Sequence, residues 1–150
     1  MINNTILLTC ARGISPYLVK ECEALGIHVE SETQAGVFTS GTLNDAMRMN
    51  LWLRSAHRVL LMLSEFTAQD ADALYEEVIK IPWEDYINKD GYLSINSSVD
   101  NPTINDNRFA SLRCKDAIVD RMQEKFGRRP DSGKESDRTV ISLYWKGSKC

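Results

Sequence analysis

The chain has 150 residues, of which 43% are hydrophobic and 26% are charged, and its formal net charge is −3. These fractions are typical of a folded globular protein and not of a disordered one. No apolar run reaches the roughly 18 residues that a membrane-spanning helix needs, and the N-terminus lacks the basic and apolar regions of a signal peptide. We therefore expect a cytoplasmic protein with no membrane partner, made of one ordinary domain or two small ones.

The net charge is an average over an acidic first part and a basic second part. From residue 103 onward there are eleven Lys and Arg residues and seven Asp and Glu residues, whereas residues 1–102 hold seven and fourteen. Such an asymmetry often marks a surface for a polyanion. The segment 102–138, which holds nine of the 18 Lys and Arg residues, is therefore the first candidate for a functional surface.

The cysteines and histidines form neither a metal-binding nor a disulfide pattern. No Cys-x-x-Cys pair occurs among Cys10, Cys22, Cys114 and Cys150, and the histidines are His28 and His57. A zinc site would have to be assembled from distant parts of the chain, so we expect no metal. The missing paired spacing also argues against a secreted disulfide scaffold.

The first residues predict a strand followed by a helix. The apolar run at 5–10 (TILLTC) has the composition of a buried strand. Ser15 followed by Pro16 is a helix-start signal, with Ser15 as the N-cap, and Gly26 is a C-terminal stop signal.

A hairpin is predicted next. Residues 27–34 alternate between apolar and polar side chains, Gly36 turns the chain, and residues 37–40 supply the second strand. Thr42 and Asp45 then have the spacing of a capping box at the start of a second helix.

Residues 57–66 (HRVLLMLSEF) complete this part of the chain as a strand that is apolar enough to be covered on both faces. The resulting order of strands and helices is βαββαβ. It predicts a ferredoxin-like domain over residues 1–66, with both helices on one face of a four-stranded antiparallel sheet.

The pattern changes from residue 67. Helical spacing continues from Asp70 to Ile79, where a helix must end before Pro82. Trp83 and Tyr86 are expected to hold the next turn against the core. Residues 93–99 then alternate between a mainly apolar and a mainly polar side, as in a strand with one face open to solvent or to a ligand.

A long helix is predicted from residue 105 or 106 to Phe126, ahead of Gly127. At 100° per residue, one side is the expected core stripe, namely Phe109, Leu112, Ile118, Val119, Met122 and Phe126. Residues 139–144 (TVISLY) form a last strand. No further strand follows it in the sequence to pair with its apolar edge. Because an unpaired apolar strand edge invites aggregation, we expect the chain to be an excerpt of a longer protein.

Three segments in matching order carry a resemblance to a known family: CARGISPYLVKECEALGI at 10–27, MNLWLRSAHRVLLML at 49–63 and NRFASLRCKDAIVDRM at 107–122. They resemble the N-terminal part of bacterial THUMP-domain RNA methyltransferases, and in particular the enzymes that methylate guanine N2 in large-subunit (23S) ribosomal RNA. The resemblance covers essentially the whole chain.

This resemblance implies an α+β protein: a ferredoxin-like domain, then a THUMP domain that binds RNA, incomplete here and spanning 67–150. A catalytic domain that uses S-adenosylmethionine would follow. The glycine-rich cofactor loop and the Asn/Asp-Pro-Pro-aromatic motif of amino-methylating enzymes are missing from residues 1–150. We therefore expect no cofactor in this chain and no methylation by it alone.

Six cations are the predicted contacts to structured RNA, and ribosomal RNA is the expected partner. Arg108 and Lys115 are two helical turns apart on the face of the core stripe, so each should emerge at the edge of that stripe or reach the adjoining polar strand. Arg108 lies near a helix N-terminus that attracts anions, and a purely structural role for both residues stays open. The other four lie in a loop with too few local acids to neutralise them: Arg128, Arg129, Lys134 and Arg138. Such contacts position RNA without reading its sequence.

Other cations of the long helix have a structural interpretation. Arg113, Arg121 and Lys125 alternate with acids of the same helix, namely Asp116, Asp120 and Glu124. A helix face with ion pairs of this kind is usually only a solvated surface.

Three other functions stay open. A strand, Ala11-Arg12-Gly13 and a helix start could hold a phosphate, as in acylphosphatase-like enzymes, although the Val-Gln-Gly-Val-like signature is missing around Arg12. The chain could also be a THUMP module of a tRNA-modifying enzyme or a protein-interaction module. No carboxylate forms a spaced pair with a His or a Ser nucleophile, so no catalytic residue is predicted.

Overall fold

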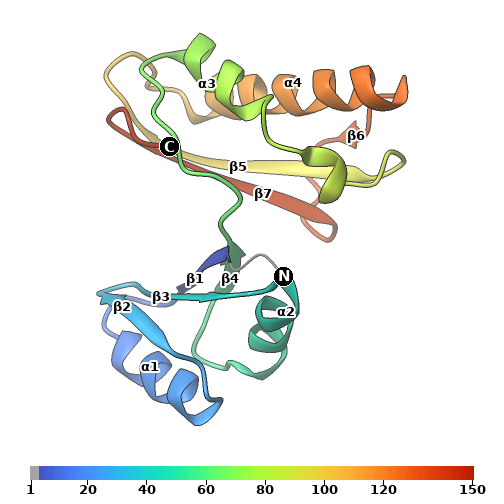
Figure 1. Cartoon of the computed structure of the whole chain (residues 1–150). Helices are drawn as coiled ribbons and strands as arrows, with labels where there is room; N and C mark the ends of the chain where they lie inside the picture. Colours follow the sequence, from blue (N-terminus) through green and yellow to red (C-terminus); the bar gives the residue numbers. More distant parts are fainter. Residues whose placement is uncertain (1–3) are drawn as a thin grey trace. The chain divides into compact units, whose positions relative to one another are not determined.

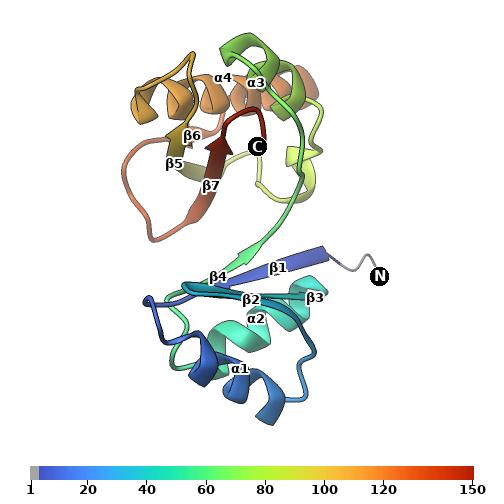
Figure 2. The ribbon, with the colours of Figure 1, turned by 90° about the vertical axis from the view of Figure 1, so that its left-hand side faces the viewer.

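A computed structural model of the chain describes residues 4–150, which form two compact units. The first unit ends at Leu63 and the second extends from Ser64 to Cys150. Each unit has its own β-sheet, with two helices on one face of that sheet (Figure 1, Figure 2).

The first unit has the predicted ferredoxin-like arrangement. Its elements are β1 (Asn4–Thr9), α1 (Ser15–Ala24), β2 (Val29–Thr33), β3 (Gly36–Gly41), α2 (Leu43–Trp52) and β4 (Arg58–Leu61). The strands follow the order β2-β3-β1-β4, and every neighbouring pair is antiparallel. The core lies between the sheet and the helices, where Ile6, Leu8 and Leu18 are fully buried.

The helix starts of this unit test two predicted caps. Thr42 forms the capping box with Asp45, because each side chain accepts a hydrogen bond from the other residue's backbone N–H. The prediction for α1 was wrong: its N-cap is Ile14, which makes no side-chain capping bond, and Ser15 is the first helical residue. Proline still stands in the first turn, where no backbone donor is needed.

The last strand of this unit is shorter than predicted. β4 covers Arg58–Leu61 and not 57–66, and residues 59–61 are only half-buried. Within residues 4–63 both helices lie on the same face of the sheet, so helices do not cover β4 on both faces (Figure 2).

The second unit packs two helices on a three-stranded sheet. Its elements are α3 (Ala71–Val78), the 3-10 turn η1 (Trp83–Asp85), β5 (Tyr92–Asp100), α4 (Asn107–Phe126), β6 (Asp131–Ser132) and β7 (Thr139–Lys146). The strand order is β6-β5-β7, and both pairs are parallel. The long helix α4 provides the crossover that a parallel β5–β7 pair requires.

The core stripe of α4 is only partly as predicted. Ile118, Val119 and Met122 are buried, but the three bulkiest members of the predicted set, Phe109, Leu112 and Phe126, are 46–49% exposed. Small residues of the helix are buried instead: Ala110, Cys114 and Ala117. Small side chains let neighbouring elements approach the helix closely, so the buried face includes them.

Candidate nucleic-acid interface

The C-terminal end of α4 leads into a basic loop, which we define as residues 127–138. Gly127 has a positive φ of 65°, a conformation that favours glycine, and turns the chain out of the helix. The loop then returns along the start of β5, where Asp131 pairs with Tyr92 and Ser132 with Leu93. The end of α4, β6 and the start of β5 therefore lie at the same end of the unit (Figure 1).

Tyr92 holds the second half of this loop. Its hydroxyl accepts a hydrogen bond from the backbone N–H of Glu135 at 3.0 Å, and its ring lies 5.9 Å from the Arg138 guanidinium. A side chain at Gly133 would collide with the Tyr92 hydroxyl. The cations of the basic loop are thus presented on backbone of defined shape, although their side chains are exposed.

The four predicted loop contacts differ in their surroundings. Lys134 and Arg138 are exposed and have no acidic partner among residues 4–150. Arg128 forms an ion pair with Asp90, and Arg129 lies 3.7 Å from the carboxylate of Asp120. The loop itself supplies no acid to Arg128 and Arg129, and the sequence did not predict these two partners, because they come from other parts of the chain.

Those two ion pairs do not remove Arg128 and Arg129 as RNA contacts. Their side chains are 65% and 58% exposed, and exposed pairs are typically weak, at about 0–1 kcal/mol. A phosphate can therefore replace the acid at little cost. Their assignment to RNA remains a prediction.

The two predicted contacts on α4 itself are also on the surface. Arg108 is exposed and has no acidic partner in the described part of the chain, and Lys115 is 3.8 Å from its neighbour Asp116. The side chain of Asp106 accepts a hydrogen bond from the backbone N–H of Arg108 at 2.8 Å. A carboxylate therefore already uses one of the backbone donors at the start of α4. The hydrogen bonds between α4 and β5 come from other residues: the hydroxyls of Ser111 and Ser97 are 2.6 Å apart, and Asn107 accepts from Ser97 and from the backbone N–H of Val99.

The remaining cations of α4 form ion pairs with acids of other elements and not with the acids of their own helix. Arg121 donates two hydrogen bonds to the carboxylate of Glu84, at 2.7 and 2.8 Å, and a third to the carbonyl of Ile79. Lys125 lies 3.0 Å from the same carboxylate. The hydrogen bonds from Arg121 hold the pKa of Glu84 far below its ordinary value and raise the pKa of Arg121.

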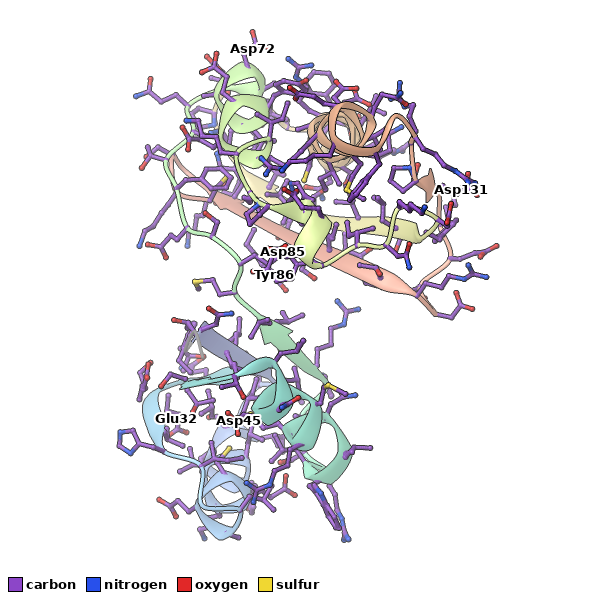
Figure 3. All side chains as sticks on the ribbon, turned by 45° about the vertical axis from the view of Figure 1, so that its right-hand side comes forward. Glu32, Asp45, Asp72, Asp85, Tyr86 and Asp131 are labelled. Atoms are coloured by element: carbon purple, nitrogen blue, oxygen red, sulfur yellow. The ribbon has the colours of Figure 1, made fainter. Side chains whose placement is uncertain are left out.

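Arg113 connects α4 to α3 in a similar way. Its guanidinium lies 2.8 Å from Asp72 and 4.4 Å from the centre of the Tyr75 ring. The hydroxyl of Tyr75 donates to Asp120 at 2.8 Å, which raises the pKa of Tyr75. Figure 3 shows Asp72 on α3. These cations therefore join α4 to α3 and η1, and do not form the intrahelical pairs that were predicted.

Arg12 does not lie in a phosphate cradle. The backbone N–H groups of Gly13 and Ile14 already donate to the carbonyls of Gln34 and Ala11, and the side chain of Arg12 donates to Gln34 at 2.8 Å. Two backbone donors of this turn and the Arg12 side chain are therefore already used by the fold, which does not favour an acylphosphatase-like site.

Residues 4–150 contain no helix that is both long and apolar enough to cross a bilayer. Among the same residues, no three His, Cys, Asp or Glu side chains gather as metal ligands would.

Sequence reasoning missed a hollow beside the basic loop. It has a volume of about 400 Å³ and lies between the η1 turn and the end of α4, with Tyr86 and Phe126 among its lining residues. Both side chains were predicted to pack on the core, yet they are 41% and 46% exposed. The sequence contained a partial signal for this hollow, because Phe126 is the residue directly before Gly127, where the helix ends.

Two family models match the chain. Residues 5–60 match the RlmL ferredoxin-like domain, and residues 68–150 match the THUMP domain.

Relatives of described function match most of the chain. A "Ribosomal RNA large subunit methyltransferase K/L" from Syntrophotalea carbinolica is 41% identical over 136 residues, which are 91% of this chain and 19% of that protein. The protein of the same description from Pseudomonas aeruginosa is 34% identical over 139 residues, again 19% of its length. The chain thus spans about a fifth of the curated relatives that it matches.

A solved structure has a closely similar fold. A protein from Listeria monocytogenes, described as a predicted N6-adenine-specific DNA methylase, superposes with a TM-score of 0.81 and 28% identity, over 99% of this chain and 39% of that one. With the THUMP model matching more than half of the chain, the chain belongs to the THUMP-domain family, and its first part is similar to the RlmL ferredoxin-like domain.

Proposed function

We propose that this chain is the RNA-binding region of an S-adenosylmethionine-dependent methyltransferase that acts on guanine N2 of large-subunit ribosomal RNA. In this proposal residues 1–66 are the ferredoxin-like domain and residues 67–150 the first part of the THUMP domain, in a cytoplasmic protein. The cofactor belongs to a catalytic domain elsewhere in the longer protein. The observation that carries the proposal is the exposed basic loop in the unit that matches the THUMP model.

The chemistry of this surface suits the backbone of structured RNA. Lys134 and Arg138 have no acidic partner among the described residues, and Arg128 and Arg129 have only exposed ones. Double-stranded RNA is recognised mostly by its shape and through phosphate and ribose contacts. Dispersed, exposed cations on a loop of fixed backbone shape can make such contacts without reading sequence.

The relatives supply the substrate class. The proteins from S. carbinolica and P. aeruginosa are described as acting on large-subunit ribosomal RNA, whereas the description of the L. monocytogenes protein names DNA. We favour RNA because identity to the ribosomal RNA enzymes is higher, at 34–41% against 28%.

The test is a binding titration of this chain. Fluorescence anisotropy would follow a labelled hairpin of large-subunit ribosomal RNA, a tRNA and a DNA hairpin of the same sequence, between about 50 and 200 mM salt. We expect the ribosomal hairpin to bind best, with an affinity that falls steeply as salt rises. Binding that is independent of salt, or at least as tight for DNA, would contradict the proposal, and preference for tRNA would assign the chain to a tRNA-modifying enzyme.

A further inference from the structure

We infer that the hollow between η1 and the end of α4 receives an unpaired guanine base of the RNA whose phosphates lie on the basic loop. The inference rests on the proposed function and adds base recognition to it. The hollow is a shallow depression of about 400 Å³ that is largely open to solvent, so a flat ring could lie in it with one face exposed. Asp85, Tyr86, Asn88, Lys89 and Phe126 are the lining residues that matter.

Two aromatic side chains line this hollow from elements that are distant in the sequence. Tyr86 follows η1, where its neighbours Trp83 and Ile87 are buried at 3% and 2% exposure and anchor the turn. The indole N–H of Trp83 donates to the carbonyl of Val78 at 2.8 Å, which fixes this turn further. Phe126 is the last residue of α4. Exposed aromatic faces are the usual platforms on which unpaired bases stack.

The two sides of the hollow are held together. Glu84 on η1 binds Arg121 and Lys125 on α4, so the turn that carries Tyr86 is joined to the helix that carries Phe126. Because these bonds exist before any ligand arrives, little ordering is needed when a base enters, and that favours affinity.

The polar groups of the hollow suit a base and not a phosphate. Asp85 is exposed and has no ion-pair partner among residues 4–150, so its carboxylate would repel a phosphate but can accept hydrogen bonds. Guanine is the base whose Watson–Crick edge presents two adjacent donors, N1–H and the N2 amino group, and a carboxylate can accept both. Figure 3 shows Asp85 and Tyr86 together at the η1 turn.

Cations lie beside the hollow, where they could contact the phosphates that flank a bound base. Lys89 lines the hollow, is exposed and has no acidic partner in the described part of the chain. Arg128 follows Phe126 by two residues and is paired to Asp90, next to Lys89. A base in the hollow would therefore continue directly into a backbone held by the basic loop.

The experiment compares two RNA hairpins of equal length, one with a single unpaired guanine and one fully paired. Tyr86→Ala and Phe126→Ala should each weaken binding of the first hairpin by about 5- to 100-fold, because each base stacked on an aromatic ring contributes on that scale. Binding of the paired hairpin should change less than about two-fold. Tyr144→Ala, at an exposed tyrosine of β7 in the same unit, is the matched control and should affect neither hairpin.

Asp85→Asn tests the choice of base. The wild-type chain should prefer an unpaired guanine to an unpaired adenine, and Asp85→Asn should remove this preference without weakening the paired hairpin. Equal losses on both hairpins, or a selective loss from Tyr144→Ala, would overturn the inference. The buried Trp83 and Trp145 report through their fluorescence that each variant is folded.

Free nucleotides separate this inference from the proposed function. Guanosine 5′-monophosphate should shift the NMR signals of the Tyr86 and Phe126 rings, and ribose 5-phosphate should not. If no RNA binds and the nucleotide still does, the proposed function fails and the base site stands. If RNA binds by salt-dependent contacts without any preference for the unpaired guanine, the base site fails and the proposed function stands.

Discussion

Arg121 and Arg128 are seven residues apart and carry the same charge, yet their surroundings are opposite. The side chain of Arg121 is 20% exposed and donates to Glu84 and to the carbonyl of Ile79. The side chain of Arg128 is 65% exposed and has one acid, Asp90, as its ion-pair partner. An arginine surrounded by several fixed acceptors is held in place by the fold. An arginine with one exposed partner keeps a charge that is available to a ligand.

The largest expected effect is on stability. Arg121→Ala should lower the free energy of unfolding of the second unit by about 2–3 kcal/mol, because it removes charge-assisted hydrogen bonds to a largely buried acid. Arg128→Ala, the matched control, should cost less than about 0.5 kcal/mol. Urea unfolding measures both through Trp83 and Trp145, which are buried in this unit while Trp52 is 65% exposed. A larger loss of unfolding free energy for Arg128→Ala than for Arg121→Ala would contradict this assignment of roles.

Next in size is the effect on RNA affinity. Arg128→Ala combined with Arg129→Ala should weaken binding about 10- to 60-fold at ~0.1 M salt and lower the salt slope by roughly 1.5–2, since two phosphate contacts are lost. Arg113→Ala combined with Lys125→Ala removes the same charge from α4, and we expect a loss below about three-fold. Anisotropy titrations at several salt concentrations would show it. Equal losses from the two pairs would mean that only net charge matters.

A smaller effect should appear as the pH falls. The pKa of folded Glu84 lies far below its ordinary value of 4.5, so its stabilising contribution is complete above about pH 4.5 and is lost progressively as the pH drops toward the folded pKa. Glu84→Gln cannot titrate. Its free energy of unfolding should therefore fall less steeply below pH 4.5, by on the order of 1 kcal/mol, in urea unfolding between pH 3 and pH 6. Parallel curves for both proteins would contradict the assignment.

The smallest expected effect concerns Arg108, an exposed cation on α4 without an acidic partner among the described residues. Arg108→Ala should weaken RNA binding about three- to eight-fold at ~0.1 M salt and lower the salt slope by about 1. Arg12→Ala, at an exposed arginine of the first unit that donates to Gln34, is the control and should leave both quantities unchanged. If Arg12→Ala alone lost RNA affinity, the RNA-binding surface would have to be assigned to the first unit.

Local signals in the sequence were reliable where one residue governs a backbone conformation. The capping box of Thr42 and Asp45 and the helix end at Gly127 are where the sequence places them. Ser15 misled because a cap depends on where the chain enters the helix, and the turn at Gly13 makes Ile14 the N-cap.

Side-chain burial and pairing were predicted less well. A helical wheel gives angles, but not which neighbour faces each angle, so Phe109 and Phe126 were assigned to the core although each is nearly half exposed. The small residues Ala110 and Ala117 were overlooked because their burial depends on how closely neighbouring elements approach the helix.

The sequence by itself determined the order of the helices and strands apart from the short β6, the ferredoxin-like arrangement of the first unit and the concentration of cations after residue 102, because these depend on periodicity, capping and composition. The tertiary structure decided which cations are neutralised. Glu84 reaches Arg121 and Asp90 reaches Arg128 from 37 and 38 positions away, and ion pairs over such separations exist only once the chain has folded. The same folding placed Tyr86 beside Phe126 and left the hollow between them.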